Sequence, residues 1–321
     1  MRNHMKKTIY VFFLAVAVLS GAWSLLWKSR HGSVDSNVSS SAHLENSAKL
    51  SVVTSFYPLY FFAQQIGSDR AVVTNIVPAG AEPHDYEPTA QDMAQMEKSR
   101  LIVVNGGGLE AWSDRLANNM NAENTTIVVA GEGLLTRAMT EDDAVTTDPH
   151  IWLDPVLAKK MTEKIALGFE AADPENAAFY RENASRLLGQ LDDLDAAYRS
   201  GLHTCAEKNI ITSHAAFGYV AAEYGFNQVS IAGLSPDAEP SSAELANIVQ
   251  FAKVNHVRYI FFERLASPKL SQTIATEVGT KTLVLNPLEG LSGDELARGE
   301  DYFSVMHGNL VNLQTALRCN Q

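Results

Sequence analysis

The sequence predicts an α/β protein of two lobes, each with a mainly parallel sheet flanked by helices, joined by one long linking helix. Its 321 residues exceed the usual size of a single domain. From Lys49 onward, short β-branched apolar runs alternate with segments of helical periodicity, as in βα units. The alternation occurs twice, on either side of a long helical stretch at residues 173–201. We therefore expect an N-terminal lobe at 49–172 and a C-terminal lobe at 202–321.

The first 48 residues differ from the rest of the chain. Three basic residues precede Thr8 to Trp27, 20 uncharged residues that are long enough to span a bilayer with the N-terminus in the cytoplasm. We expect residues 1–27 to form a membrane anchor, with a cleaved signal segment as the alternative. Residues 28–48, rich in Ser and Asn, are expected to be a flexible tether. The body of the protein is then extracytoplasmic.

Strands and helices of the N-terminal lobe follow from apolar runs and from helix start and stop signals. Residues 131–147 are polar and acidic, and we expect a loop there. The predicted strands are Leu50 to Phe56, Ala71 to Val77, Leu101 to Val104 and Thr126 to Val129, and the predicted helices are Pro58 to Ile66, Thr89 to Ser99, Leu109 to Asn119 and Val156 to Glu170.

In the second half, Asp173 and Pro174 have the residue types of an N-cap followed by proline at the first helical position, so they are expected to open the linking helix. A second α/β alternation follows. Its predicted strands are 209–211, 228–231, 258–262 and 282–285, and its predicted helices are 215–224, 243–255, 268–278 and 301–318.

Three histidines stand out from their surroundings. His150 lies between two Asp-Pro steps, in a segment that the prolines hold rigid and non-helical. His84 and His214 each follow a predicted strand, 66 residues before and 64 residues after His150. Such long separations exclude a local zinc-finger motif and suit one metal ligand from each of several loops. The alternative is that each histidine is structural.

Carboxylates accompany these histidines. Glu263 and Glu289 follow predicted strands of the second half, at the edge where open α/β sheets bind ligands. Three imidazoles and one carboxylate form a tetrahedral set that suits zinc, whereas more carboxylates favour manganese. Asp85 and Asp148 are close in sequence to His84 and His150, and they are candidates to accept hydrogen bonds from those rings.

Several motifs in this chain resemble those of the zinc/manganese solute-binding proteins of ABC transporters. The resemblance covers about residues 50 to 319, and the motifs occur in the family's order. They are Thr54-Ser55-Phe56-Tyr57-Pro58, Pro83-His84-Asp85-Tyr86-Glu87-Pro88, Asp148-Pro149-His150-Ile151-Trp152-Leu153-Asp154-Pro155, Ser213-His214-Ala215-Ala216-Phe217-Gly218-Tyr219, Phe262-Glu263 with Ser267-Pro268-Lys269, and Asn286-Pro287-Leu288-Glu289.

The resemblance implies capture of a divalent metal between the lobes and its delivery to the membrane subunits of an ABC permease. Carried over by motif, the metal ligands are His84, His150, His214 and Glu289, with Glu263 as the competing fourth ligand. A histidine at the third position resembles the zinc branch, so the expected cargo is Zn²⁺, with Mn²⁺ as the alternative. Residues 131–147 contain no histidine, unlike the long histidine-rich loop of many zinc-type members.

Two further expectations concern covalent structure and function class. Cys205 and Cys319 are the two cysteines, and in an extracytoplasmic protein we expect them to form a disulfide, with two buried thiols as the alternative. The net charge of −12 disfavours nucleic acid as a partner. We expect a monomer. We also expect no enzymatic activity, because the sequence lacks a His-Glu-x-x-His helix and an evident general base. A zinc hydrolase and a metal-dependent surface adhesin are the rival classes.

Overall fold

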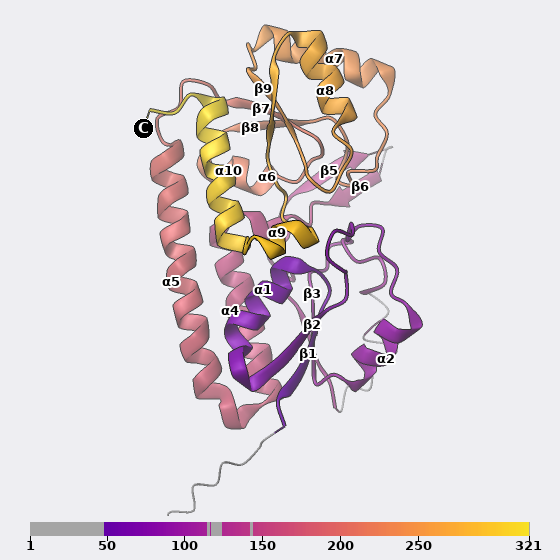
Figure 1. Cartoon of the computed structure of the whole chain (residues 1–321), viewed down its shortest axis with the longest axis vertical. Coiled ribbons are helices and arrows are strands. Elements are labelled where there is room, and N and C mark those ends of the chain that lie inside the picture. The colour runs from indigo at the N-terminus through magenta and orange to yellow at the C-terminus, as the bar shows by residue number, and fades with distance from the viewer. Residues whose placement is uncertain (1–47, 114–115, 117–123, 142–143, 321) are drawn as a thin grey trace, which may run out of the picture. The chain divides into compact units, whose positions relative to one another are not determined.

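The computed structural model describes residues 48–113, 116, 124–141 and 144–320. Figure 1 shows two regions of parallel sheet with helices around them, and a long helix, α5 (Ala177–Leu202), that runs alongside both. This confirms the predicted fold class. The expected membrane anchor lies outside the described residues, as does the expected tether except for Ala48. Five of the eleven residues of the helix predicted at 109–119 lie outside them as well. Within the described residues, no helix is long and apolar enough to cross a membrane.

The N-terminal sheet has the strand order β2-β1-β3-β4, with every pair parallel. Helices α1 and α4 cover one face, where they pack on Val52, Leu101 and Val103, and α2 supplies Met96 to the opposite face. Because both faces are covered, β3 is apolar and buried throughout. The elements are β1 (Leu50–Thr54), α1 (Tyr57–Gly67), β2 (Ala71–Asn75), α2 (Ala90–Lys98), β3 (Leu101–Val104), β4 (Thr126–Val129) and α4 (Pro155–Ala172).

The C-terminal sheet has the order β10-β9-β7-β8, again parallel. Ile211 and Ile260 pack against α7 and α8 on one face, and α10 contacts β7 and β10. The elements are β7 (Asn209–Thr212), α6 (Gly218–Tyr224), β8 (Asn227–Ser230), α7 (Ser242–Val254), β9 (Tyr259–Phe262), α8 (Lys269–Val278), β10 (Lys281–Val284), α9 (Gly293–Ala297) and α10 (Tyr302–Leu317).

The linking helix α5 (Ala177–Leu202) packs along α4, α1 and α10. Its start differs from the prediction, because a 3₁₀ turn at Pro174–Asn176 precedes it and Asp173 does not cap it. The Asp173 carboxylate instead accepts hydrogen bonds from the side chains of Asn176 and Tyr180, at 2.8 and 2.6 Å. Those side-chain donors compete with the backbone N–H groups that an N-cap would serve.

The prediction of a loop at 131–147 was wrong for most of its second half. Strands β5 (Ala138–Glu141) and β6 (Ala144–Thr147) form an antiparallel hairpin there. The short helix α9 was also missed, although Ser292 and Glu295 form a capping box at its start. Polar composition obscured the hairpin. Its two strands satisfy their backbone groups by pairing with each other, and they do not depend on burial of an apolar face that would give an apolar pattern in the sequence.

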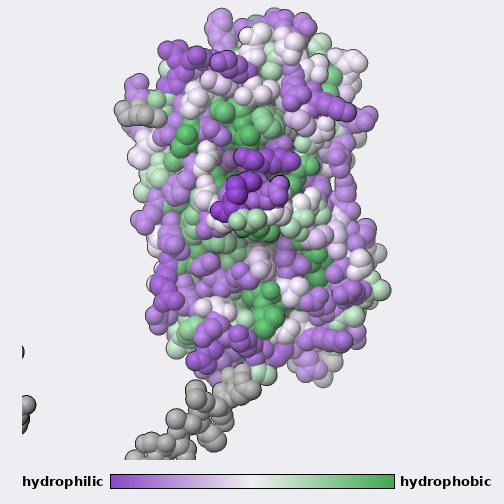
Figure 2. Space-filling view, viewed as in Figure 1, coloured by the Kyte–Doolittle hydropathy of each residue, from purple (hydrophilic) through white to green (hydrophobic). Residues whose placement is uncertain are grey.

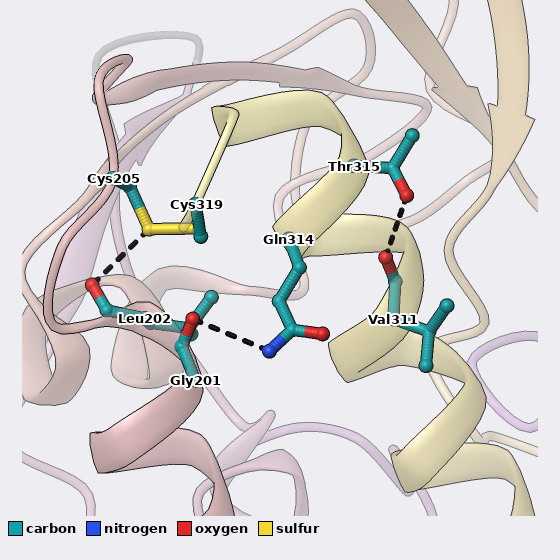
Figure 3. The surroundings of a disulfide bond; sticks show 7 residues. All are labelled: Gly201, Leu202, Cys205, Val311, Gln314, Thr315 and Cys319. Atoms are coloured by element: carbon teal, nitrogen blue, oxygen red, sulfur yellow. Dashed lines mark hydrogen bonds between the residues drawn. A yellow bond between two sulfur atoms is a disulfide. The ribbon is translucent and has the colours of Figure 1, made fainter. Parts of the chain in front are cut away.

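Cys205 and Cys319 form a disulfide, as predicted. Figure 3 shows that it joins the segment after α5 to the end of α10, next to a hydrogen bond from Gln314 to the carbonyl oxygen of Gly201 at 3.3 Å.

Hydrophilic side chains cover much of the face drawn in Figure 2, with a strongly hydrophilic group over α9. The large exposed apolar side chains are scattered over the sequence, for example Val72, Val145 and Val311.

Candidate metal centre

Four side chains from both lobes converge on one point. The ring nitrogens of His84, His150 and His214 and a carboxylate oxygen of Glu289 all lie within 4.8 Å of one another. Glu289 Oε1 is 3.3, 3.1 and 3.0 Å from the Nε2 atoms of these three rings, in that order. His150 Nε2 is 3.3 Å from the Nε2 atoms of both His84 and His214.

These separations match the edges of a small tetrahedron. Zinc binds imidazole nitrogen and carboxylate oxygen at about 2.0–2.2 Å, so the edges of its tetrahedron are about 3.3 Å long. Glu289 presents one oxygen to all three rings, as a monodentate ligand would. The four atoms therefore have the number, type and spacing that suit a single zinc ion.

Each of the four candidate ligands follows a strand or lies in a rigid connecting segment. His84 is in the loop after β2, and His150 immediately precedes a 3₁₀ turn at Ile151–Leu153. His214 follows β7, and Glu289 lies in the segment after β10. In parallel sheets these are carboxyl ends of strands, where side chains from different βα units meet.

Two of the rings are oriented by a second carboxylate. Asp148 Oδ1 accepts hydrogen bonds from the backbone N–H of His150 at 3.0 Å and from its Nδ1 at 2.9 Å. Glu263 Oε1 accepts from His214 Nδ1 at 2.6 Å. With the proton held at Nδ1, Nε2 of each ring presents its lone pair to the centre. Glu263 therefore lies behind a ligand and outside the group of four.

Asp85 has a different neighbour. Its carboxylate is hydrogen-bonded to that of Asp237, and this contact raises the pKa of Asp237. Among the described residues, His84 Nδ1 has no carboxylate partner. His84 is also the one candidate ligand of the four that is not fully buried, with a side chain 10 % exposed. This ring is thus held less firmly than the other two.

Buried charge strongly perturbs the titration of the centre. Burial lowers the pKa of His214, but the negative charges of Glu263 and Glu289 outweigh it and raise this pKa well above its usual value. Burial raises the pKa of Glu289, yet the neighbouring imidazoles bring it well below its usual value. Burial and the charge of Glu289 raise the pKa of nearby Glu82 to about 8. Without a metal ion, the His214 ring therefore binds a proton more strongly than a free imidazole does.

The backbone around Glu289 is held in an unusual conformation. Leu288, fully buried, has a φ of 56°, in the left-handed region that non-glycine residues seldom adopt. The Asn286 side chain accepts from the N–H of Leu288 at 2.8 Å, and Asn309 bonds the N–H and the carbonyl oxygen of Asn286 at 2.9 and 2.7 Å. These bonds secure a turn that directs Glu289 towards the histidines.

Sequence reasoning missed the aromatic residues that support His150. Trp152 Nε1 donates to the carbonyl oxygen of Pro287 at 2.8 Å, and Tyr302 donates to the carbonyl oxygen of Trp152 at 2.6 Å. Tyr219 donates to the carbonyl oxygen of Asp148 at 3.1 Å. Trp152 and Tyr219 lie inside the motifs of His150 and His214, but their spacing along the chain gives no sign that they make contacts across the lobes.

Comparison with known proteins is consistent with this geometry. The family model described as "Zinc-uptake complex component A periplasmic" matches residues 52–316. The high-affinity zinc uptake system protein ZnuA of Bacillus subtilis is 41 % identical over 280 residues, which are 84 % of this chain and 88 % of that protein. The zinc-binding lipoprotein AdcA of Streptococcus pneumoniae is 40 % identical over 277 residues, and there the chain spans only 55 % of the relative's length.

Solved structures give the same result. The Zn(II)-bound ZnuA-like domain of Streptococcus pneumoniae AdcA is 39 % identical, with a TM-score of 0.74, and the match covers 84 % of this chain and 99 % of that one. The laminin-binding protein Lmb of Streptococcus agalactiae, described as bifunctional with adhesin and metal transporting activity, is 31 % identical at a TM-score of 0.75, with the same coverage. The chain thus belongs to the family of the periplasmic component A of the zinc-uptake complex.

Proposed function

We propose that this protein is the extracytoplasmic substrate-binding component of a zinc ABC transporter. It captures one Zn²⁺ with His84, His150, His214 and Glu289 and passes the ion to a membrane permease. The observation that carries this proposal is the convergence of four candidate ligand atoms within 4.8 Å of one another. Five of their six separations are 3.0–3.3 Å, close to the edge of a zinc tetrahedron. The zinc-binding and zinc-uptake names of the relatives support it.

The donor set favours zinc over manganese. Three nitrogens and one oxygen suit a tetrahedral ion, whereas manganese prefers oxygen ligands and a higher coordination number. Glu263, which would add a second carboxylate, is hydrogen-bonded to His214 Nδ1 instead. In a direct competition, we expect zinc to displace manganese from the protein.

Transport also fits the centre better than catalysis does. A catalytic zinc keeps one coordination position open for water, whereas four protein ligands close the tetrahedron. We therefore propose that the protein is not an enzyme.

One chain supplies every ligand, so a monomer is sufficient for capture, and the net charge of −12 repels nucleic acid. The segment Thr8 to Trp27 would hold the protein at the outer face of the cytoplasmic membrane.

Lmb gives a specific reason to consider a second function, namely adhesion to a host matrix protein. Laminin binding by the purified protein, measured with and without zinc, tests it. Binding that requires the intact metal centre would support a metal-dependent adhesin, whereas no binding in either state would leave metal capture as the function.

The direct test is metal content and titration calorimetry on the purified protein, on His84→Ala and on His214→Ala. His307→Ala is the matched control, because His307 is exposed on α10 and outside the centre. We expect one tightly bound zinc per chain in the parent and in the control, and a large loss of affinity in the other two variants. Equal binding by all four proteins would refute the proposal.

A further inference from the structure

We propose that Tyr219 is a positioning residue: its hydroxyl fixes the Asp148–His150 pair to the C-terminal lobe, so that His150, His214 and Glu289 form one preassembled set of ligands. This inference rests on the proposed function of the centre. His150 comes from the N-terminal half of the sequence, whereas His214 and Glu289 come from the other half. The inference explains how ligands from opposite lobes keep a fixed spacing.

The Tyr219 hydroxyl makes three hydrogen bonds across the lobes. Its side chain is 5 % exposed and starts from α6, five residues after His214. The hydroxyl donates to the carbonyl oxygen of Asp148 at 3.1 Å and accepts from the backbone N–H groups of Thr136 and Arg137, both at 3.1 Å. The hydroxyl oxygen of Tyr219 therefore links helix α6, which follows His214, to the segment that contains His150 and to the segment before β5.

The Asp148 side chain carries this restraint to the metal centre. Its Oδ1 holds both the backbone N–H and the Nδ1 of His150. Its Oδ2 faces the guanidinium of Arg137 at 3.7 Å, and that guanidinium lies 5.7 Å from the centre of the Tyr219 ring. Holding Asp148 thus fixes both the position and the tautomer of His150.

Gly218 leaves the room that this arrangement requires. A Cβ atom at Gly218 would lie 2.8 Å from Arg137 Nε and 2.9 Å from Asp148 Oδ2. The start of α6 can therefore approach the Arg137–Asp148 pair this closely only with glycine at that position. The contact is a built feature of the interface between the lobes.

A second bond acts on the other side of His150. Trp152 Nε1 donates to the carbonyl oxygen of Pro287, two residues before Glu289, and the indole ring packs 5.1 Å from the His150 ring. His150 is thus linked to the C-terminal lobe through residues on both sides of it in sequence. The position of His150 is therefore set by the segments that contain His214 and Glu289 as much as by the sheet of its own lobe.

The test compares Tyr219→Phe with Tyr224→Phe. Tyr224 is on the same helix, and its hydroxyl donates to Asp195, on α5, at 2.9 Å. Tyr224→Phe removes that hydrogen bond and therefore shows what a general weakening of the packing of α6 does to zinc binding. Zinc Kd is measured by competition with a chelator, and thermal unfolding is measured on the metal-free proteins. We expect Tyr219→Phe to raise Kd about ten-fold or more and Tyr224→Phe to leave it unchanged, since residues that orient ligands typically contribute 10- to 100-fold in affinity.

Two results would overturn the inference. The first is a Tyr219→Phe variant that is less stable but binds zinc like the parent, as a merely structural role requires. The second is an equal rise of Kd in both variants. If Tyr219→Phe does not fold, Trp152→Phe is measured in the same assay. It removes the second bond to the C-terminal lobe and keeps an aromatic ring, while the smaller side chain also leaves a gap at a fully buried position. An unchanged Kd there, in spite of both changes, would also overturn the inference.

Amide hydrogen exchange separates this inference from the proposed function. In the metal-free protein, the amides of Thr136 and Arg137 lose their acceptor in Tyr219→Phe, so their exchange should accelerate, and it should not in Tyr224→Phe. If the parent protein binds no zinc, the proposed function fails, and this measurement alone decides whether Tyr219 holds the segment. Unchanged exchange at these amides would then reject the inference.

Discussion

The Glu263 carboxylate accepts a hydrogen bond from Nδ1 of His214 at 2.6 Å, while Nε2 of the same ring lies 3.0 Å from Glu289. Both glutamates follow strands of the same sheet, Glu263 directly after β9 and Glu289 in the segment after β10, yet they occupy different positions relative to one imidazole. One lies behind the ring and orients it, and the other shares the centre with it. This difference makes their roles separable by experiment.

Replacing each glutamate with glutamine should reveal that difference. Glu263→Gln keeps a hydrogen-bond acceptor behind His214, and we expect zinc affinity to fall about 10- to 100-fold. Glu289→Gln removes the one negative charge among the four ligands, and we expect a larger loss. Chelator competition on both variants measures the order, and a larger loss for Glu263→Gln would make Glu263 the ligand.

Zinc binding should weaken as the solution becomes more acidic. The pKa values of His150 and His214 are raised in the metal-free protein, so both rings bind protons more strongly than free imidazole and zinc must displace those protons. We expect affinity to fall as the pH is lowered, starting above about pH 6.5, the usual pKa of imidazole, with protons released on binding. Calorimetry in buffers of different ionisation enthalpy counts these protons, and a binding heat that is the same in every buffer would contradict the expectation.

Asp154 should make the metal-free protein less stable as pH rises. It caps α4 by accepting from the N–H of Val156, and burial together with the charges of Glu223 and Asp195 raises its pKa to about 7. Between about pH 4 and about pH 7 its carboxyl is protonated when folded and ionised when unfolded, so ionisation favours unfolding.

Asp154→Asn keeps the capping oxygen and does not titrate. We expect the variant to gain stability relative to the parent as pH rises through that window, by up to about 1.4 kcal/mol per pH unit, and the gain to level off above about pH 7. Urea unfolding of both proteins with a chelator present measures this difference at each pH. Parallel stability curves would show that the carboxyl is already ionised in the folded state at low pH.

Loss of the disulfide should destabilise the protein without weakening zinc binding. Cys205 and Cys319 are 114 residues apart, and closing so long a loop is worth about 4–5 kcal/mol in a chain-entropy model. We expect the double variant Cys205→Ser, Cys319→Ser to lose a substantial part of that free energy of unfolding, and therefore to unfold at a lower urea concentration. Its zinc Kd should match that of the parent, because none of the four ligands is next to the bond in sequence. A lower zinc affinity would show that the disulfide also supports the metal centre.

Much of the fold was accessible from the sequence because its signals are local. The apolar runs Leu101–Val104 and Thr126–Val129 are strands with the predicted ends, and Thr89 and Asp301 cap helices as their residue types suggest. Each depends on periodicity or on hydrogen bonds within a few residues. The hairpin β5–β6 and helix α9 escaped because their signals are short and polar.

The chemistry of the centre could be read from the residue types alone: three histidines and a glutamate, each in a rigid segment after a strand or between prolines. The packing of the two lobes was needed to show which glutamate meets the rings, that Asp85 faces Asp237, and that Trp152 and Tyr219 connect His150 to the other lobe. Residue type sets which bonds a side chain is able to make, but partners that are far apart in the sequence are selected by how the two sheets pack.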